Sequence, residues 1–398
     1  MLLLMCIGLL LGPLLGIVPP DFLGEAGNTI VMLILVMILF EGATKLRLQY
    51  LQKAILGTLS LTLISFLLTT LGVGFLLWKF LPLDAVLSFL IGAIIGGNAT
   101  AVVVPLIEKI KIKEEAKTTL FLESGLSDVL SIVLTLGLIA SLEAGVFHID
   151  SVVFNIIIMS VMAVIIGGIS ALFWSFFLNK VHNVHNSAFA TPAFVFIVYG
   201  ITELLGYSGL VSIIVFGIIL GNIPTLVSAA KEKHTFLYAM FHPQPLSSRE
   251  LSFFCEIVFL IKIFFFIFIG ISLNFNDLSL ILLGLLLALF IFTIRIPAIL
   301  LSLPKSTPKF DASIITVTLP RGLAAGVLAL IPLQRGLENG QIVQDIAYAV
   351  IFFSVLLTSL LIFLIYNTKI RKLYEHLFHE FAENPKEGSP EYPKKPDL

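Results

Sequence analysis

Stretches of apolar residues long enough to cross a lipid bilayer recur along nearly the whole chain, and they leave room for very few fold classes. A membrane-spanning helix needs roughly 20 predominantly apolar residues, and about twelve segments of this kind are present. They lie at residues 2–18, 27–44, 54–78, 83–107, 116–142, 151–178, 188–204, 206–222, 251–273, 278–301, 311–332 and 342–368. Because a helix satisfies its own backbone hydrogen bonds inside lipid, the sequence predicts an all-α polytopic membrane protein.

The composition excludes a soluble protein. Of the 398 residues, 58% are hydrophobic and 12% are charged, whereas soluble domains carry about 25% charged residues. Cys6 and Cys255 both lie in apolar segments, so neither a disulfide framework nor a thiolate metal site is indicated. The N-terminal segment lacks a basic leader and a cleavage site, and we interpret it as the first span rather than a signal peptide. No nucleotide-binding loop or basic nucleic-acid patch occurs in the sequence, and we expect no cofactor and no nucleic-acid partner.

The basic residues predict how the chain is oriented. Most of the 24 Lys and Arg residues follow even-numbered spans or lie in the C-terminal tail, while the opposite loops contain Lys79 and Arg335. Three further basic residues lie within spans: Lys262, Arg295 and Arg321. By the positive-inside rule, we predict that both termini are cytoplasmic. We expect the protein to lie in the plasma (inner) membrane. We expect a transmembrane domain of residues 1–368 and a cytoplasmic tail of 369–398 that starts as an amphipathic helix and continues as disordered chain.

The chain repeats itself at an offset of seven spans. The first span contains Gly8–Pro13, which resembles Gly217–Asn222 in the eighth, and the second ends with Ile38–Gly42, which resembles Phe266–Gly270 in the ninth. Since seven is odd, the two copies face opposite ways across the membrane. An inverted repeat of this kind is typical of secondary transporters.

The same offset pairs the fourth span with the eleventh, and both are interrupted in their middle. Gly96–Thr100 breaks the fourth, and Leu319–Gly322 breaks the eleventh. Non-helical backbone at that depth is tolerated only where it lines a cavity or is buried in protein. We therefore predict two crossed discontinuous helices whose ends and side chains face a bound ion. Packing glycines with one proline kink are the simpler alternative.

Two carboxylates inside the span 116–142 indicate an ion or proton path, because charged groups near the centre of a bilayer are costly. Asp128 lies one helical turn from Ser124, and Glu123 lies one turn from Ser127. Asp128 with Ser124 is suited to bind a small cation through oxygen atoms. Glu123 is expected to form a structural charge pair with Arg321, which always carries its charge, while Arg295 is expected to snorkel to the end of its span.

Three classes of protein could use these acids. A secondary transporter is the leading hypothesis, because the inverted repeat favours alternating access. A cation channel could use Glu123 and Asp128 as a selectivity ring. A polytopic membrane enzyme could use them as paired acid and base, but no His lies within a span to support that chemistry, and we expect no enzyme activity.

Four motifs, taken in order, resemble the core motifs of the cation/proton antiporter superfamily, in its monovalent sodium/proton exchanger branch. They are Phe40–Gly42, the sequence GGNATAVV at 96–103, Glu123–Asp128 and Leu319–Gly322. The resemblance covers nearly all spans and aligns the first of them with the second helix of the family. It implies a homodimeric antiporter in membrane lipid, with a core ion site from spans 83–142 and 251–332 that moves against a dimerisation domain.

The resemblance also implies roles for individual residues. The expected ion and proton site consists of Asp128, Ser124, Asn98, Ala99 and Thr100. Glu41 is expected near the cytoplasmic approach to this site, and Glu123 in a pair with Arg321. The expected activity is exchange of a monovalent cation, sodium before potassium or lithium, for protons by alternating access, in support of pH homeostasis.

Two departures from the family pattern affect the expected stoichiometry. Ser127 stands where the exchanger branch commonly has Asn and electrogenic relatives have a second acid, and serine cannot carry a proton. We therefore expect electroneutral exchange of one cation for one proton at Asp128. Lys262 stands about where electrogenic relatives carry a lysine, and it could release a second proton if it loses its charge when buried.

Overall fold

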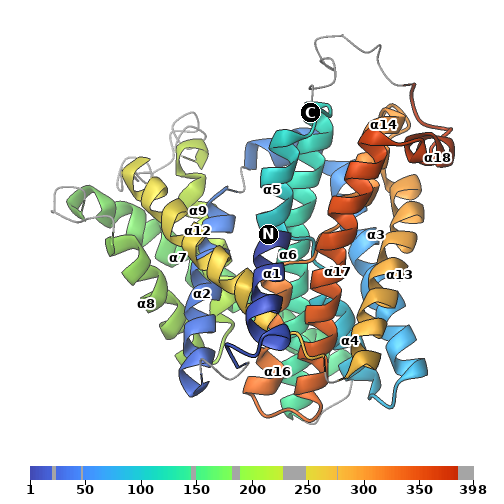
Figure 1. The fold of residues 1–398 in the computed structure, drawn as a ribbon. Coiled ribbons are helices and arrows are strands. Elements are labelled where there is room, and N and C mark those ends of the chain that lie inside the picture. The colour runs from blue at the N-terminus through green and yellow to red at the C-terminus, as the bar shows by residue number, and fades with distance from the viewer. Residues whose placement is uncertain are drawn as a thin grey trace. The chain divides into compact units, whose positions relative to one another are not determined.

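The computed structural model describes residues 1–19, 24–45, 48–144, 149–181, 189–226, 248–275 and 277–383 (Figure 1). Throughout these ranges the regular structure is helical, and one isolated β-bridge joins Pro308 to Ala382. The predicted all-α membrane fold is confirmed. Most of the tail that we predicted to be disordered, residues 384–398, lies outside the described residues.

In the described part of the chain, six helices are long and apolar enough to cross a membrane: α3 (Leu48–Phe80), α6 (Glu114–Ala144), α7 (Ile149–Val181), α12 (Ser248–Ile271), α13 (Leu278–Ser302) and α17 (Gly340–Asn367). The others are α1 (Leu2–Leu9), extended by a π-helical turn at Leu10–Leu14, α2 (Gly24–Lys45), α4 (Ala85–Ile94), α5 (Thr100–Lys109), α8 (Ala190–Leu204), α9 (Gly209–Gly221), α14 (Lys309–Val317), α15 (Leu323–Leu328), α16 (Ile331–Gln334) and α18 (Ile370–Leu377). The predicted spans 83–107 and 311–332 are the two that break into shorter helices.

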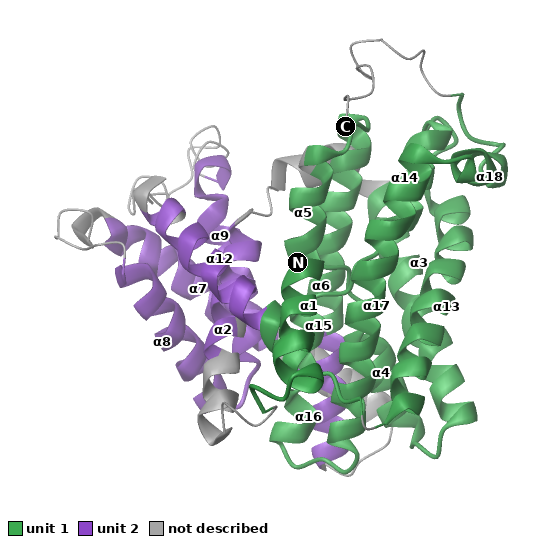
Figure 2. Ribbon diagram, viewed as in Figure 1, with its two compact units in different colours: residues 1–19, 53–131, 266–398 green, residues 20–52, 132–265 purple. Residues whose placement is uncertain are grey.

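The chain forms two compact units, shown in green and purple in Figure 2. Unit 1 consists of residues 1–19, 53–131 and 266–398, and unit 2 consists of residues 20–52 and 132–265. Both broken helices belong to unit 1, and α2, α7, α8 and α9 belong to unit 2. The predicted boundary at residue 368 between a membrane domain and a tail stays a prediction.

Close helix packing relates the two copies of the predicted inverted repeat. In unit 1, a Cβ added to Gly8 of α1 would collide with the backbone of α12 at Ile267 and Gly270. In unit 2, a Cβ added to Gly217 of α9 would collide with the backbone of α2 at Phe40. The first element of each copy therefore packs against the second element of the other copy. Small residues allow this close approach of helix backbones in membranes.

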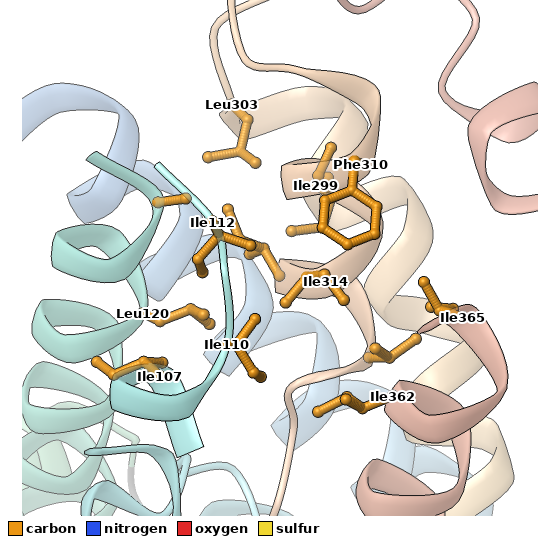
Figure 3. Close-up of a cluster of buried hydrophobic side chains, with 14 of the residues drawn as sticks. Ile107, Ile110, Ile112, Leu120, Ile299, Leu303, Phe310, Ile314, Ile362 and Ile365 are labelled. Atoms are coloured by element: carbon orange, nitrogen blue, oxygen red, sulfur yellow. The ribbon is translucent and has the colours of Figure 1, made fainter. Parts of the chain in front are cut away.

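A buried apolar cluster holds one end of unit 1 together (Figure 3). It combines side chains from α5 and the loop after it, from α6, α13, α14 and α17: Ile107, Ile110, Ile112, Leu120, Ile299, Leu303, Phe310, Ile314, Ile362 and Ile365. Phe378 and Phe381, which follow α18, are buried in the same cluster. The cluster fixes one half of each broken helix, α5 and α14, to continuous helices beside them.

Replacing Gly8 by Ala is expected to lower the stability of the folded protein by about 1–3 kcal/mol, because the added methyl group overpacks a backbone contact. Thermal unfolding in detergent micelles measures this loss as a lower Tm. Gly200→Ala is the matched control, because a Cβ on Gly200 in α8 meets no atom within 4 Å. Equal melting temperatures for the two variants would contradict the close contact between α1 and α12.

Candidate ion-binding site

The two broken helices of unit 1 cross at their interruptions. The first break follows α4 and contains Gly96 and Gly97, which weaken a helix because glycine loses the most backbone entropy. The second follows α14 and contains Pro320, which has no N–H to donate and disfavours a helical residue before it. The backbone N–H of Ala99 donates to the carbonyl oxygen of Pro320 at 2.7 Å. This bond joins the two breaks directly.

Further contacts fix the crossing. Asn98 donates from Nδ2 to the carbonyl oxygen of Thr318 at 3.3 Å. A Cβ added to Gly322 would collide with the Cβ of Ala99, so the backbones approach too closely for any other residue there. The predicted pair of crossed discontinuous helices is therefore present, and packing glycines with a single kink do not describe it.

Asp128 of α6 lies at the N-terminal end of α5. The hydroxyl of Thr100, the first residue of α5, donates to Oδ2 of Asp128 at 3.0 Å. The other carboxylate oxygen lies beside the backbone of Gly97, 3.2 Å from the position a Cβ would take there. The positive end of a helix stabilises an anion such as this carboxylate, and Asp128 as a whole residue is partly exposed.

Ser127, which precedes Asp128 in α6, is bonded to the backbone of Asn98 at the first break. The hydroxyl of Ser127 accepts a hydrogen bond from the backbone N–H of Asn98 at 2.9 Å and donates to the carbonyl oxygen of Ser124 at 3.1 Å. Ser127 thus satisfies the exposed backbone of the first break. The side-chain oxygen Oδ1 of Asn98 is buried and has no hydrogen-bond partner among the described residues. It is an unused oxygen at the crossing point.

The role of Ser124 as a partner of Asp128 in ion binding stays a prediction, and its hydroxyl is bonded within its own helix. Its hydroxyl donates to the carbonyl oxygen of Phe121 in its own helix at 2.9 Å, and the residue is fully buried. The i, i+4 spacing placed Ser124 beside Asp128 along α6 correctly, but that spacing could not show which acceptor its hydroxyl would choose. A serine inside a helix often bonds to a carbonyl of the preceding turn.

The predicted pair of Glu123 with Arg321 is wrong, because Glu123 pairs with Arg295 of α13. Both terminal nitrogens of Arg295 donate to the carboxylate, with Nη2 at 2.6 Å from Oε2, and Nη1 also donates to the hydroxyl of Ser65 at 2.7 Å. The two charged side chains are 0% and 2% exposed. Arg295 is about 10 Å from the end of α13 at Ser302, too deep to snorkel, and this depth was a signal in the sequence for a buried partner.

Arg321 instead neutralises the end of α4. Its Nη1 donates to the carbonyl oxygens of Gly96 and Gly97 at 2.8 and 2.7 Å, just beyond the last residue of that helix. A cation at a helix C-terminus is stabilised by the helix dipole and satisfies free carbonyl groups. The backbone N–H of Arg321 donates to the hydroxyl of Ser354 on α17 at 2.9 Å. Arg321 is therefore committed to backbone oxygens rather than to Glu123.

Glu41 and Lys262 form an ion pair within unit 2, which the sequence analysis did not anticipate. Lys262 Nζ of α12 lies 3.1 Å from Oε2 of Glu41 of α2, and the two side chains are 15% and 6% exposed. The residues are 221 positions apart in the chain, so no spacing pattern could reveal the contact. Lys262 thus has an acidic partner.

The Glu123–Arg295 pair predicts a strong coupling in stability. Glu123→Gln or Arg295→Gln alone is expected to lower the free energy of unfolding by about 3–5 kcal/mol, because each leaves a buried unpaired charge. The double variant should lose less than the sum of the two single losses. Melting temperatures in detergent micelles provide the measurement.

Glu123→Gln combined with Arg321→Gln is the comparison. The losses in that combination should come closer to simple addition, because Arg321 bonds to carbonyl oxygens. A stronger coupling of Glu123 with Arg321 than with Arg295 would restore the original pairing.

Comparison with known proteins agrees with this architecture. The sequence pattern of the family described as sodium/hydrogen exchanger, transmembrane, matches residues 1–368. "Na(+)/H(+) antiporter 1" of Methanocaldococcus jannaschii is 27% identical over 232 residues, 55% of this chain and 53% of that protein. "K(+)/H(+) antiporter NhaP2" of Shewanella sp. (strain ANA-3) is 27% identical over 331 residues, 81% of this chain and 54% of that protein. The chain thus spans about half the length of the curated relatives that it matches.

A solved structure shares the fold. The sodium proton antiporter MjNhaP1 from Methanocaldococcus jannaschii at pH 8 superposes with a TM-score of 0.71 and 24% sequence identity. The match covers 90% of this chain and 92% of that structure. At this identity the likeness establishes the fold, and the chemistry has to be argued from the residues of the site.

Proposed function

The chain belongs to the sodium/hydrogen exchanger family, and we propose that it exchanges a monovalent cation for protons across a membrane. The observation that carries the proposal is the position of Asp128, whose carboxylate lies at the crossing of two broken helices and accepts a hydrogen bond from Thr100. Half-helix ends and irregular backbone at such a crossing are the features by which secondary transporters bind ions.

Competition for one carboxylate supplies the coupling. Deprotonated Asp128 offers an oxygen ligand of the kind that hard cations prefer, and protonated Asp128 does not. We propose the Thr100 hydroxyl, which is bonded to Asp128, and the Oδ1 of Asn98, which has no hydrogen-bond partner among the described residues, as further oxygen ligands for the same ion. Alternating access of the site to the two sides of the membrane then exchanges a cation for a proton.

Sodium is the proposed cation, with potassium and lithium as the ions to compare with it. The name of the family and those of two relatives refer to sodium or to potassium exchange with protons. We further propose a homodimer in the plasma (inner) membrane with both termini in the cytoplasm. The distribution of basic loops supports that orientation.

The charges around the site favour an electroneutral cycle. In unit 1, Glu123 and Asp128 balance Arg295 and Arg321 when all four are ionised, and either a proton or a monovalent cation adds the same single charge. In unit 2, Lys262 is paired with Glu41, so its charge has a partner of its own apart from Asp128. The proposed cycle therefore uses Asp128 alone and exchanges one cation for one proton.

Asp128→Asn is expected to abolish exchange, because an amide can neither release the proton nor bind the cation with a charge. Proteoliposomes with a pH-sensitive dye inside report the rate when sodium, potassium or lithium is added outside. Asp277→Asn is the matched control, since Asp277 precedes α13, is hydrogen-bonded to Ser279 and lies outside the spans. Normal cation-dependent proton movement by Asp128→Asn would remove this residue from the mechanism.

The electroneutral stoichiometry predicts that exchange is insensitive to membrane potential. Proteoliposomes clamped with valinomycin and potassium at zero or at −100 mV should show the same initial rate and the same final pH difference. Sodium concentration for half-maximal rate should rise as the pH falls, since protons occupy the same carboxylate. A rate or an end point that follows the potential would contradict the one-for-one cycle and implicate Lys262.

A further inference from the structure

α18 begins where a membrane span ends. Only Thr368 and Lys369 separate it from α17, whose last residue is Asn367. Two large apolar side chains in the last turns of α17, Leu360 and Phe363, are 47% and 60% exposed, as expected for a surface that faces lipid. The covalent connection therefore holds α18 within a few ångströms of the boundary between hydrocarbon and water.

The apolar face of α18 is wider than the protein surface that covers it. Ile370, Tyr374 and Phe378 form one stripe at i, i+4 spacing, and this stripe packs against the buried cluster of unit 1. Leu373 and Leu377 form the neighbouring stripe and are 61% and 39% exposed. Half of the apolar face is thus open, along one edge of the helix.

Basic residues flank the open edge. Lys369, Lys372 and His376 are exposed on the side of the helix next to Leu373. Arg371 faces the protein, where its guanidinium lies 4.7 Å from the centre of the Phe310 ring and its Nε donates to Glu375 at 2.8 Å. Exposed leucines beside lysines form the pattern of a helix that lies in the plane of a membrane surface.

The turn after α18 is fixed to the start of α14. The backbone N–H of Lys309 donates to the carbonyl oxygen of Ala382 at 3.0 Å. The backbone N–H of Ala382 donates to the carbonyl oxygen of Lys305 at 2.9 Å. Glu380 pairs with Lys305, and Glu383 pairs with Lys309. These contacts hold the end of α18 against the start of α14, one half of a broken helix.

We propose that α18 binds anionic phospholipid headgroups, with Leu373 and Leu377 inserted between the lipids and Lys369 and Lys372 at the phosphates. The partner is the leaflet at the C-terminal end of α17. Chain continuity brings α18 to the bilayer, and the charge of its exposed edge is complementary to anionic lipid. The proposal assigns α18 a lipid contact that does not depend on the exchange reaction.

Spin labels measure this contact directly in the full-length chain. Cys6 and Cys255, both exposed, are replaced by Ser, and single labels are attached to Leu373→Cys, Leu377→Cys or Lys372→Cys. The variants are reconstituted in vesicles of phosphatidylethanolamine and phosphatidylglycerol. A label at Leu282→Cys on α13 serves as the lipid reference, because the side chain of Leu282 is 55% exposed within an apolar span.

Labels at 373 and 377 should relax faster with oxygen than with a water-soluble nickel chelate, as the label at 282 does, and the label at 372 should show the reverse. Replacing Lys369 and Lys372 by Gln should shift the label at 373 toward water, and so should vesicles of phosphatidylcholine alone. Labels at 373 and 377 as accessible to nickel as the label at 372 would overturn the proposal. Immobilised labels shielded from both reagents would also overturn it and would point to a protein partner or a second copy.

Sodium-driven proton movement in the same vesicles is a separate measurement. Loss of the lipid contact with exchange intact would refute the role of α18 alone. Loss of exchange with the lipid contact intact would refute the proposed function alone.

Discussion

A helix that stops in the middle of a membrane span exposes backbone N–H and C=O groups that lipid cannot satisfy, and unit 1 contains two such helices. Several of these backbone groups have a protein partner at the crossing. The side chain of Arg321 donates hydrogen bonds to the carbonyl oxygens after α4, and the hydroxyl of Ser127 accepts one from the N–H of Asn98. At the second break, the hydroxyl of Ser354 on α17 accepts a hydrogen bond from the backbone N–H of Arg321. The same constraint leaves the start of α5 free for the carboxylate of Asp128. The position of the candidate ion site thus follows from how the breaks are satisfied.

The division of charges follows from this arrangement. Arg295 and Glu123 satisfy each other away from water, and Arg321 serves the backbone. Within this group, Asp128 differs from Glu123 because it bonds to the hydroxyl of Thr100 rather than to an arginine. A carboxylate without a bonded arginine is suited to accept a transient positive charge, whether a proton or a metal cation.

Local signals in the sequence predicted the helices and the two breaks, and the repeat at an offset of seven spans paired the broken helices with each other. Glycines, a proline and hydrophobic length act within one segment, and they can be read without knowledge of its neighbours. Ion pairs between segments could not be predicted in this way, because their partners lie far apart in the sequence. Glu123 and Arg295 are 172 residues apart, and Glu41 and Lys262 are 221 residues apart. Helical spacing shows which residues share a face, but the rotation of the neighbouring helix decides which arginine meets an acid.

Thr100 gives the site a property that a residue without a hydroxyl would not provide. A hydroxyl donates one hydrogen bond and also accepts, so it can reverse its role by rotating about a single bond. With Asp128 ionised, Thr100 is the donor; with Asp128 protonated, the acid can donate and Thr100 can accept. The hydrogen bond between Thr100 and Asp128 can therefore be kept in both protonation states, with movement of hydrogen atoms alone at this contact. Thr100, the first residue of α5, can therefore bond to Asp128 whether or not the acid carries a proton.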